Sequence, residues 1–115
     1  MVSVFIVEGW NDDKQLKFTY PDKLETIVTN GTKWHWKIRD KIQAKLDEGK
    51  QVYILTDPDA PGQAIADWLK SFFPELVQID VPKEKACCMT GKRMKYGVEY
   101  MSRKDIRDMI GHLID

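Results

Sequence analysis

The stretch Val2-Ser3-Val4-Phe5-Ile6-Val7, followed at once by Glu8-Gly9, decides the fold class of this chain. The run is almost entirely apolar and rich in β-branched residues. Such a run is typical of a strand buried on both faces, as in the parallel sheets of α/β proteins. Glu8 then lies at the carboxyl end of that strand, which is the end where ligands bind in a parallel sheet.

The rest of the chain alternates apolar strand patterns with helical ones. We expect further strands at 26–29, 51–56 and 76–81, helices at about 11–19, 34–46, 62–73 and 102–113, and a lysine- and glycine-containing loop at roughly 83–97. Helical crossovers between short strands favour a parallel sheet covered on both faces. The sequence therefore predicts a single α/β domain over residues 1–115, with about four mainly parallel strands.

Charge and composition exclude some classes of function. The chain has 18 basic and 18 acidic residues, and zero net charge argues against a general nucleic-acid coat protein. Residues 83–104 hold seven basic residues against two acidic ones, which suits either a polyanionic substrate or a solvated lysine-rich loop. No apolar run reaches the roughly 20 residues that span a bilayer, and the N-terminus lacks a secretory pattern, so we expect a cytoplasmic protein. The adjacent Cys87 and Cys88 predict reduced thiols.

A second acidic motif, Asp57-Pro58-Asp59, follows the strand predicted at 51–56. Residues two apart in extended backbone point to the same side, and a proline between them biases Asp57 toward extended geometry. Together with Glu8, these carboxylates would converge on one cleft, where Mg²⁺ or Mn²⁺ would relieve their repulsion. The alternative interpretation is a turn that ends in a helix N-cap.

The neighbours of these acids also leave alternatives open. Glu8 could instead pair with Lys14 or with the basic loop, since an unpaired charge near the core edge is costly. Asp12 could be a fourth acidic contributor or simply a helix cap. Gly9 would allow a ligand to approach the backbone, and Gly62 would allow a tight turn into the following helix.

Two helices are predicted to bury an aromatic face. The members of these faces are Trp34, Ile38, Ile42 and Leu46 in one helix, and Ile65, Trp68, Leu69 and Phe72 in the other. Trp36 falls on the other side of its helix and should be more exposed. It could stack on unpaired bases, although packing against a neighbouring element is the commoner fate of a tryptophan. His35 could titrate near neutral pH.

Taken together, Val7-Glu8-Gly9 with Asp12, and Thr56-Asp57-Pro58-Asp59 with Gly62, resemble the Toprim domain. That domain occurs in topoisomerases, bacterial primases and several small nucleases. Its pattern is a glutamate-glycine after the first strand and an aspartate-x-aspartate after the third. The resemblance implies a Rossmann-like Toprim fold and a site that binds divalent metal.

Three further segments are similar to one branch of the family, the ribonuclease that matures the 5S ribosomal RNA precursor. They are Thr29-Asn30-Gly31, Pro82-Lys83-Glu84-Lys85-Ala86 and Gly97-Val98-Glu99-Tyr100. The resemblance implies an RNA substrate, favoured over DNA, and a protein partner that supplies further RNA contacts. That maturase carries a further C-terminal segment, so this chain is expected to be either a natural stand-alone version or a truncated one.

The resemblance assigns roles residue by residue. Glu8, Asp57 and Asp59 map onto the catalytic, metal-associated acids and Asp12 onto a further metal-associated position, whereas whether Glu99 joins the site stays open. The residues expected to meet the nucleic-acid backbone are Lys83, Lys85, Lys92, Arg93 and Lys95, and those with structural roles are Gly9, Asn30, Gly31 and Gly62. The chain departs from the family at Trp10, Asn11 and Gln63, where lysine, an acidic residue and glutamate are common.

These observations predict metal-dependent phosphodiester hydrolysis, with RNA as the favoured substrate and Mg²⁺, or alternatively Mn²⁺, as the cofactor. Glu8 would act either as a metal ligand or as a general base or acid. Two alternatives stay open. One is a module that binds Mg²⁺ and phosphate without cleavage, and the other is a Toprim fragment that works only within a larger, primase-like complex.

Overall fold

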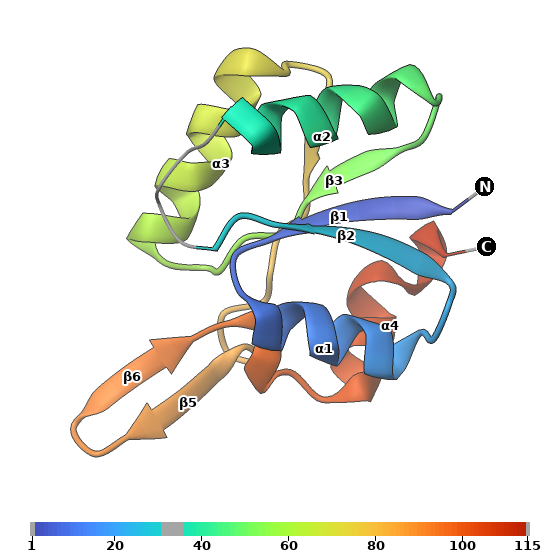
Figure 1. The fold of residues 1–115 in the computed structure, drawn as a ribbon. Coiled ribbons are helices and arrows are strands. Elements are labelled where there is room, and N and C mark those ends of the chain that lie inside the picture. Colours follow the sequence, from blue (N-terminus) through green and yellow to red (C-terminus); the bar gives the residue numbers. More distant parts are fainter. Residues whose placement is uncertain (1, 31–35, 115) are drawn as a thin grey trace.

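A four-stranded parallel sheet forms the centre of the computed structural model, which describes residues 2–30 and 36–114 (Figure 1). The strands are β1 (Ser3–Val7), β2 (Leu24–Val28), β3 (Val52–Ile54) and β4 (Val77–Gln78), in the spatial order β2-β1-β3-β4. Neighbouring strands run parallel, and Ile6 lies opposite both Ile27 and Ile54. The predicted parallel sheet is confirmed, with β1 and β3 as its central strands.

Helices cover both faces of the sheet, as the sequence predicts. They are α1 (Trp10–Thr19), α2 (Trp36–Asp47), α3 (Ala60–Phe72) and α4 (Arg103–Ile110), together with the short 3-10 helices η1 (Val98–Tyr100) and η2 (Gly111–Leu113). Helices α2 and α3 lie on one side of the sheet, and α1 and α4 lie on the other (Figure 1). The result is a three-layer α/β arrangement.

Strand β1 has no solvent-facing side, because its alternate residues enter two separate cores. Val4 and Ile6 pack with residues of α2 and α3, whereas Phe5 and Val7 pack with residues of α1 and α4. All four side chains are completely buried. Each contributes about 1.5–3 kcal/mol of hydrophobic stabilisation, so this one strand holds the two layers together.

Among the predicted inner-face residues that the structure describes, only Phe72 is misplaced. Ile65 and Leu69 of α3 are buried, but Phe72 is 43% exposed, and its ring lies 4.2 Å from the guanidinium carbon of Arg39. Phe73 is buried instead. The reason is that α3 ends at Phe72, so the non-helical backbone of Phe73 turns the next ring toward the core.

The tryptophan cluster is only partly described. Trp36 is 62% exposed, which confirms the prediction that it lies outside the core face. Trp34 and His35 lie outside the described residues. Ile38 and Ile42 of α2 are buried, and Leu46 packs against the same core.

The segment predicted as a loop at 83–97 instead contains a β-hairpin, so that prediction was wrong. Strands β5 (Cys87–Thr90) and β6 (Arg93–Tyr96) pair antiparallel, and Gly91 has a left-handed φ of 62° in the turn. Most of the hairpin is exposed. Polar and apolar residues alternate only over the four residues of β6, and β5 shows no alternation, which is too little to mark a half-buried strand. Cys87 and Cys88 are free thiols, as expected, and being neighbours in a strand they lie on opposite faces.

The lengths and compositions of the described helices can be compared with those of membrane-spanning helices. Within residues 2–30 and 36–114, none is long and apolar enough to cross a bilayer.

Candidate active site at the carboxyl edge of the sheet

Glu8 and Asp57 meet at the carboxyl edge of the sheet, because the strands that they follow are neighbours. The backbone N–H of Asp57 donates a hydrogen bond of 2.6 Å to Oε2 of Glu8. Both side chains are half-buried. Glu8 therefore bonds to the other acidic motif rather than to a lysine, and among the described residues it forms no ion pair with Lys14 or the basic segment.

Asp12 takes the role of helix cap, one of the two roles that the sequence left open. Its Oδ2 accepts a 3.1 Å hydrogen bond from the backbone N–H of Gly9, which caps the start of α1. Its Oδ1 accepts a 2.9 Å hydrogen bond from the backbone N–H of Glu99. The side chain is only 5% exposed. Asp12 is therefore a helix cap that also ties η1 to the acidic cluster.

Asp59 is the N-cap of α3, as the alternative interpretation of its motif predicts. Its Oδ1 accepts a 2.8 Å hydrogen bond from the backbone N–H of Gly62, and its own N–H donates to the Asp57 carbonyl at 2.9 Å. A Cβ on Gly62 would lie 2.0 Å from that carbonyl oxygen. This close approach, rather than an unusual φ, is why the position needs glycine.

The segment after the hairpin completes the cluster, and this part of the site was not settled by the sequence. The backbone N–H of Val98 lies 3.4 Å from Oδ1 of Asp57. Glu99 lines a cleft together with Asp59 and Tyr100. The Gly97-Val98-Glu99 motif was the available signal, but only the tertiary structure places it beside residues 40 to 90 positions earlier in the chain.

Burial and repulsion between like charges dominate the electrostatics. Burial raises the pKa of Asp12 to about 6, although hydrogen bonds from the N–H groups of Glu99 and Gly9 oppose the rise. The pKa of Asp57 is raised to about 9, first by burial, then by its hydrogen bond with Glu8 and by the nearby charge of Asp12. The Glu8–Asp57 pair is therefore costly to ionise fully, and a bound cation would lower that cost.

The predicted basic residues fall in three places. Lys83 lines the same cavity of about 350 Å³ as Asp57 and Asp59. Lys85 lies apart from that cavity and pairs with Asp105 of α4 at 3.3 Å. The other three, Lys92, Arg93 and Lys95, belong to the hairpin, and Arg93 and Lys95 line the cleft beside Glu99. The structure thus places Lys83 in the cavity of the Asp57-Pro58-Asp59 motif, and it places Arg93 and Lys95 in the neighbouring cleft that Asp59 also lines.

Three predicted positions outside the acidic and basic sets are Asn30, Gly31 and Trp10. Asn30 has a left-handed φ of 56°, in keeping with the predicted turn, and Gly31 lies outside the described residues. Trp10, at the family's lysine position, begins α1 next to Glu8-Gly9 and is 61% exposed.

The residues fit a magnesium ion by the chemistry of their oxygen donors but do not form a closed cage. Carboxylates are hard ligands that suit Mg²⁺ and Mn²⁺, and the raised pKa of Asp57 reflects negative charge with no compensating cation. In the described part of the chain, however, no three acidic, histidine or cysteine side chains stand ready to hold a metal ion together. Mg²⁺ commonly takes one or two carboxylates and keeps several waters, which suits this open arrangement.

A Rossmann-like α/β domain with acidic residues gathered at the carboxyl edge of its two central strands is the class that this fold and site define. The chain belongs to the Toprim domain family, whose sequence profile matches residues 3–86. A solved structure of a small TOPRIM domain protein from Bacillus stearothermophilus aligns with a TM-score of 0.75 and 22% identity, covering 100% of this chain and 89% of that one. That likeness confirms the Rossmann-like fold.

Curated relatives point to one branch of the family. Ribonuclease M5 from Staphylococcus aureus is 29% identical over 108 residues, which is 94% of this chain and 57% of that protein. Ribonuclease M5 from Bacillus cereus is 33% identical over 107 residues, which is 90% of this chain and 52% of that protein. The chain thus spans about half the length of the ribonuclease relatives that it matches.

Proposed function

We propose that this chain is a metal-dependent ribonuclease domain that hydrolyses phosphodiester bonds in RNA. The observation that carries the proposal is the meeting of Glu8, Asp57 and Asp12 at the carboxyl edge of β1 and β3, with Lys83 lining the adjoining cavity. Similarity to proteins named ribonuclease supports RNA as the substrate.

We assign the metal ligands to the acidic cluster. Asp57 and Glu8 are the first pair of ligands, and Asp12 and Asp59 would contribute after they release part of their capping bonds. A bound Mg²⁺ or Mn²⁺ would polarise the scissile phosphate and lower the pKa of an attacking water. The uncompensated charge around Asp57 supports this assignment, since a cation is the partner that the site lacks.

The chain's own residues would then divide the remaining work. Glu8 accepts a hydrogen bond from the Asp57 backbone, so its second oxygen is the one available to take a proton from water or to bind metal. Lys83 would hold a phosphate oxygen at the cavity wall, where its ammonium offsets the backbone charge. Asp12 would act mainly as a positioning residue, because its two oxygens already hold α1 and η1.

We propose precursor 5S ribosomal RNA as the first substrate to test, on the strength of the resemblance to the maturase branch. The activity would then belong in the cytoplasm, beside that RNA, and a protein partner would add contacts to the folded precursor. Lys92, Arg93 and Lys95 would carry the backbone contacts supplied by this chain itself.

The test is cleavage of labelled precursor 5S RNA with Mg²⁺ or Mn²⁺, compared with single- and double-stranded DNA. We expect site-specific RNA products from the unmodified chain, none with EDTA, and none from Asp57→Asn. Asp47→Asn, an exposed aspartate at the far end of α2, is the matched control and should cleave normally. Product formation by Asp57→Asn, or in EDTA, would exclude the proposed chemistry.

A non-catalytic module that binds Mg²⁺ and phosphate is the second candidate. The observation that favours it is that Asp12 and Asp59 already hold capping bonds, which engage two of the four acids of the cluster. In that case the chain would bind Mg²⁺ and RNA with measurable affinity and yield no product from any substrate. A Toprim fragment of a larger complex would instead become active only after a partner is added.

A further inference from the structure

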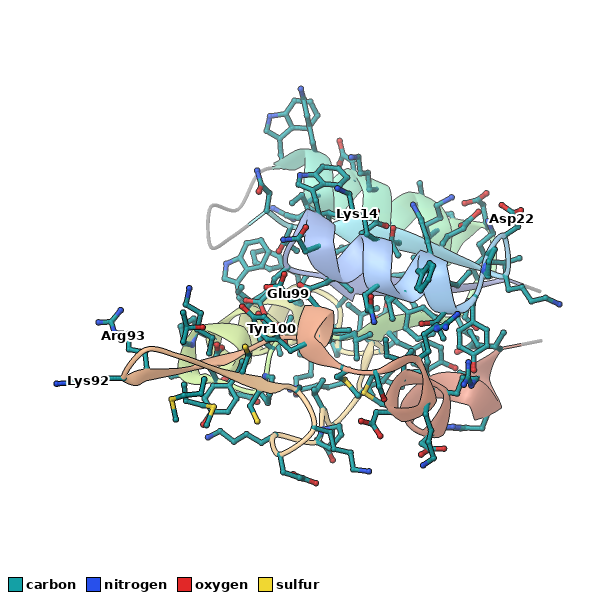
Figure 2. All side chains as sticks on the ribbon, turned by 90° about the horizontal axis from the view of Figure 1, so that it is seen from below. Lys14, Asp22, Lys92, Arg93, Glu99 and Tyr100 are labelled. Atoms are coloured by element: carbon teal, nitrogen blue, oxygen red, sulfur yellow. The ribbon has the colours of Figure 1, made fainter. Side chains whose placement is uncertain are left out.

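The β5–β6 hairpin leaves the body of the domain as an arm. In Figure 1 it projects away from the sheet and its helices, and in Figure 2 Lys92 and Arg93 mark its far end while Glu99 and Tyr100 mark its base. The Toprim profile ends at residue 86, just before the arm begins. The arm therefore lies beyond the part of the chain that defines the family.

The base of the arm is anchored on the acidic cluster. Gly97, the residue after β6, donates its N–H to the carbonyl of buried Ala86 at 2.8 Å, and a Cβ built on it would lie 3.5 Å from Oδ1 of Asp57. Val98 donates to the same Asp57 oxygen. Lys83, four residues before β5, also contacts the arm: its ammonium lies 4.9 Å from the centre of the ring of Tyr96, the last residue of β6. These contacts fix the starting point of the arm relative to Asp57.

The far part of the arm carries positive charge that the described residues do not neutralise. Lys92, Arg93 and Lys95 form no ion pair within residues 2–30 and 36–114, and no acidic residue occurs between positions 87 and 97. By contrast, Lys85 and Lys104, close to the domain body, pair with Asp105 and Asp108. The charge of the arm is thus free to meet a polyanion.

The hairpin register divides the arm into two faces. Cys88 lies opposite Lys95 and Thr90 opposite Arg93, so both cations project from one face. Met89 lies opposite Met94 on the other face, and these methionines are 60% and 43% exposed. The face with Arg93 and Lys95 is therefore suited to bind phosphates. The face with Met89 and Met94 provides control positions for substitution on the same arm.

The length of β6 sets the reach of the arm. Four residue steps separate Gly97 from Arg93, and at a rise of about 3.4 Å per residue they place the tip about 14 Å from the base. A regular RNA duplex places successive backbone phosphates a few ångströms apart along its axis, so this reach spans several base-pair steps. A duplex holds that spacing, whereas a flexible single strand does not.

We propose that the β5–β6 arm binds the backbone of helical RNA several base pairs from the phosphate held at the acidic cluster. The domain thereby selects RNA in which a duplex adjoins the site, and this inference rests on the proposed RNA substrate. Lys92 and Arg93 supply the distal phosphate contacts. The anchoring of Gly97 and Val98 beside Asp57 keeps the distance between the two contacts constant.

Binding in EDTA tests the arm without requiring cleavage. Stem-loop RNAs with stems of 3 and 12 base pairs are titrated with the unmodified chain, with Lys92→Ala/Arg93→Ala, and with Lys104→Ala/Arg107→Ala as a charge-matched control on α4. The tip variant should weaken binding of the long stem at least about tenfold at 0.1 M salt and lower the salt slope by about 2, leaving the short stem unchanged. Equal losses in the control variant or on the short stem would overturn the inference.

Two further variants separate a fixed reach from simple attraction. Adding two residues to each strand keeps both faces in register and moves the tip by about 7 Å, so the minimum stem length should rise. Met89→Ser/Met94→Ser should leave RNA affinity unchanged. An unchanged length threshold, or a loss confined to the methionine variant, would refute the arm. Normal length-dependent binding without cleavage would refute the proposed hydrolysis alone.

Discussion

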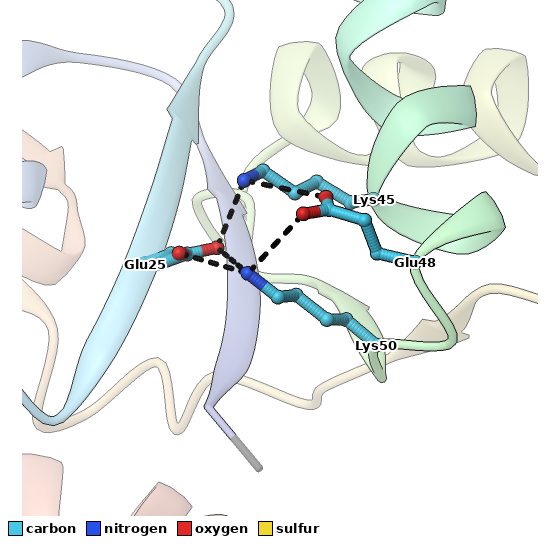
Figure 3. Close-up of polar contacts among 4 residues, drawn as sticks. All are labelled: Glu25, Lys45, Glu48 and Lys50. Atoms are coloured by element: carbon cyan, nitrogen blue, oxygen red, sulfur yellow. Dashed lines mark hydrogen bonds and ion pairs between the residues drawn. The ribbon is translucent and has the colours of Figure 1, made fainter.

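At the amino end of the sheet, Glu25 of β2 lies between two lysines, whereas at the carboxyl end Glu8 and Asp57 lie against each other. Lys50 Nζ is 2.9 Å from both Glu25 oxygens and Lys45 Nζ is 3.1 Å from one of them, with Glu48 also within reach (Figure 3). The hydrogen bond from Lys50 is the main cause that lowers the pKa of Glu25. At the other end, the pKa of Asp57 is raised to about 9.

The difference separates acids that serve the fold from acids that await a ligand. The chain neutralises Glu25 with its own lysines, so that cluster is complete without any added molecule. It leaves Asp57 and Asp12 half to fully buried without such a partner, at a cost in folding free energy. An acid whose pKa is raised in this way is the stronger candidate for function.

The largest effect should come from replacing the central acid. Asp57→Asn keeps the shape and an oxygen that can accept from the Val98 N–H but removes the ionisable carboxyl group that would bind the metal. RNA cleavage should fall at least about 100-fold, while the midpoint of thermal unfolding stays equal or rises, because a strained acid is removed. Cleavage rates and thermal melts in EDTA check this. A variant that melts much lower and also loses activity would show that Asp57 serves the fold.

Two glycines extend the comparison to the backbone. Gly62→Ala would place a Cβ 2.0 Å from the Asp57 carbonyl oxygen, and the overpacking should cost about 3 kcal/mol or more in the free energy of unfolding. Gly49→Ala, at the other end, meets no atom within 4 Å and should cost about 1 kcal/mol, because only its φ of 79° is unfavourable. Urea denaturation of both variants measures the difference, and equal losses would contradict the close approach.

The two ends should also differ in their response to pH. The folded pKa values of Asp12 and Asp57 exceed the unfolded value of 3.8, so the folded state binds more protons between about pH 4 and 9. Without metal, the free energy of unfolding should therefore be larger at pH 5 than at pH 8. Mg²⁺ should stabilise the chain more at pH 8 than at pH 5, since it replaces those protons. Urea titrations in EDTA and in Mg²⁺ test this, and stability that rises with pH in EDTA would contradict it.

The smallest effect should come from Glu25→Gln. Its side chain is 37% exposed, so the loss of the two lysine contacts should cost less than about 1 kcal/mol and shrink further in salt. Since the pKa of Glu25 is lowered, this contribution exists above the unfolded pKa and disappears as the pH falls through the folded pKa. Cleavage should stay normal. A loss of activity as large as that of Asp57→Asn would erase the distinction between the two ends.

Local periodicity explains which parts of the fold were predictable. The run at Val2–Val7 predicts a doubly buried strand because both of its faces must be apolar, and the structure buries β1 on both sides. The parallel topology then brings Glu8 and Asp57 to one edge. The prediction for Phe72 is wrong because α3 ends at this residue, and helical periodicity no longer indicates the buried side once the helix ends.

The rest depends on contacts between distant residues. The exposed hairpin has only a weak short-range signal, the alternation within β6, and its strands are specified by pairing with each other rather than by a core. The bond from the Glu99 N–H to Asp12 joins residues 87 positions apart, and it uses the backbone rather than the glutamate side chain. Lys85 looks like its basic neighbours in sequence, yet Asp105 on α4 engages it.

The bond between Asp12 and η1 has a consequence for how the protein is made. All four strands of the parallel sheet have been synthesised once Gln78 is in the chain, but the N–H of Glu99 is added only later. That interval is roughly 20 residues, or about 1–4 s at common rates of translation. A nascent chain can therefore assemble its sheet while its acidic cluster is still open, and the cluster is complete only when η1 is added and docks on Asp12 and Asp57.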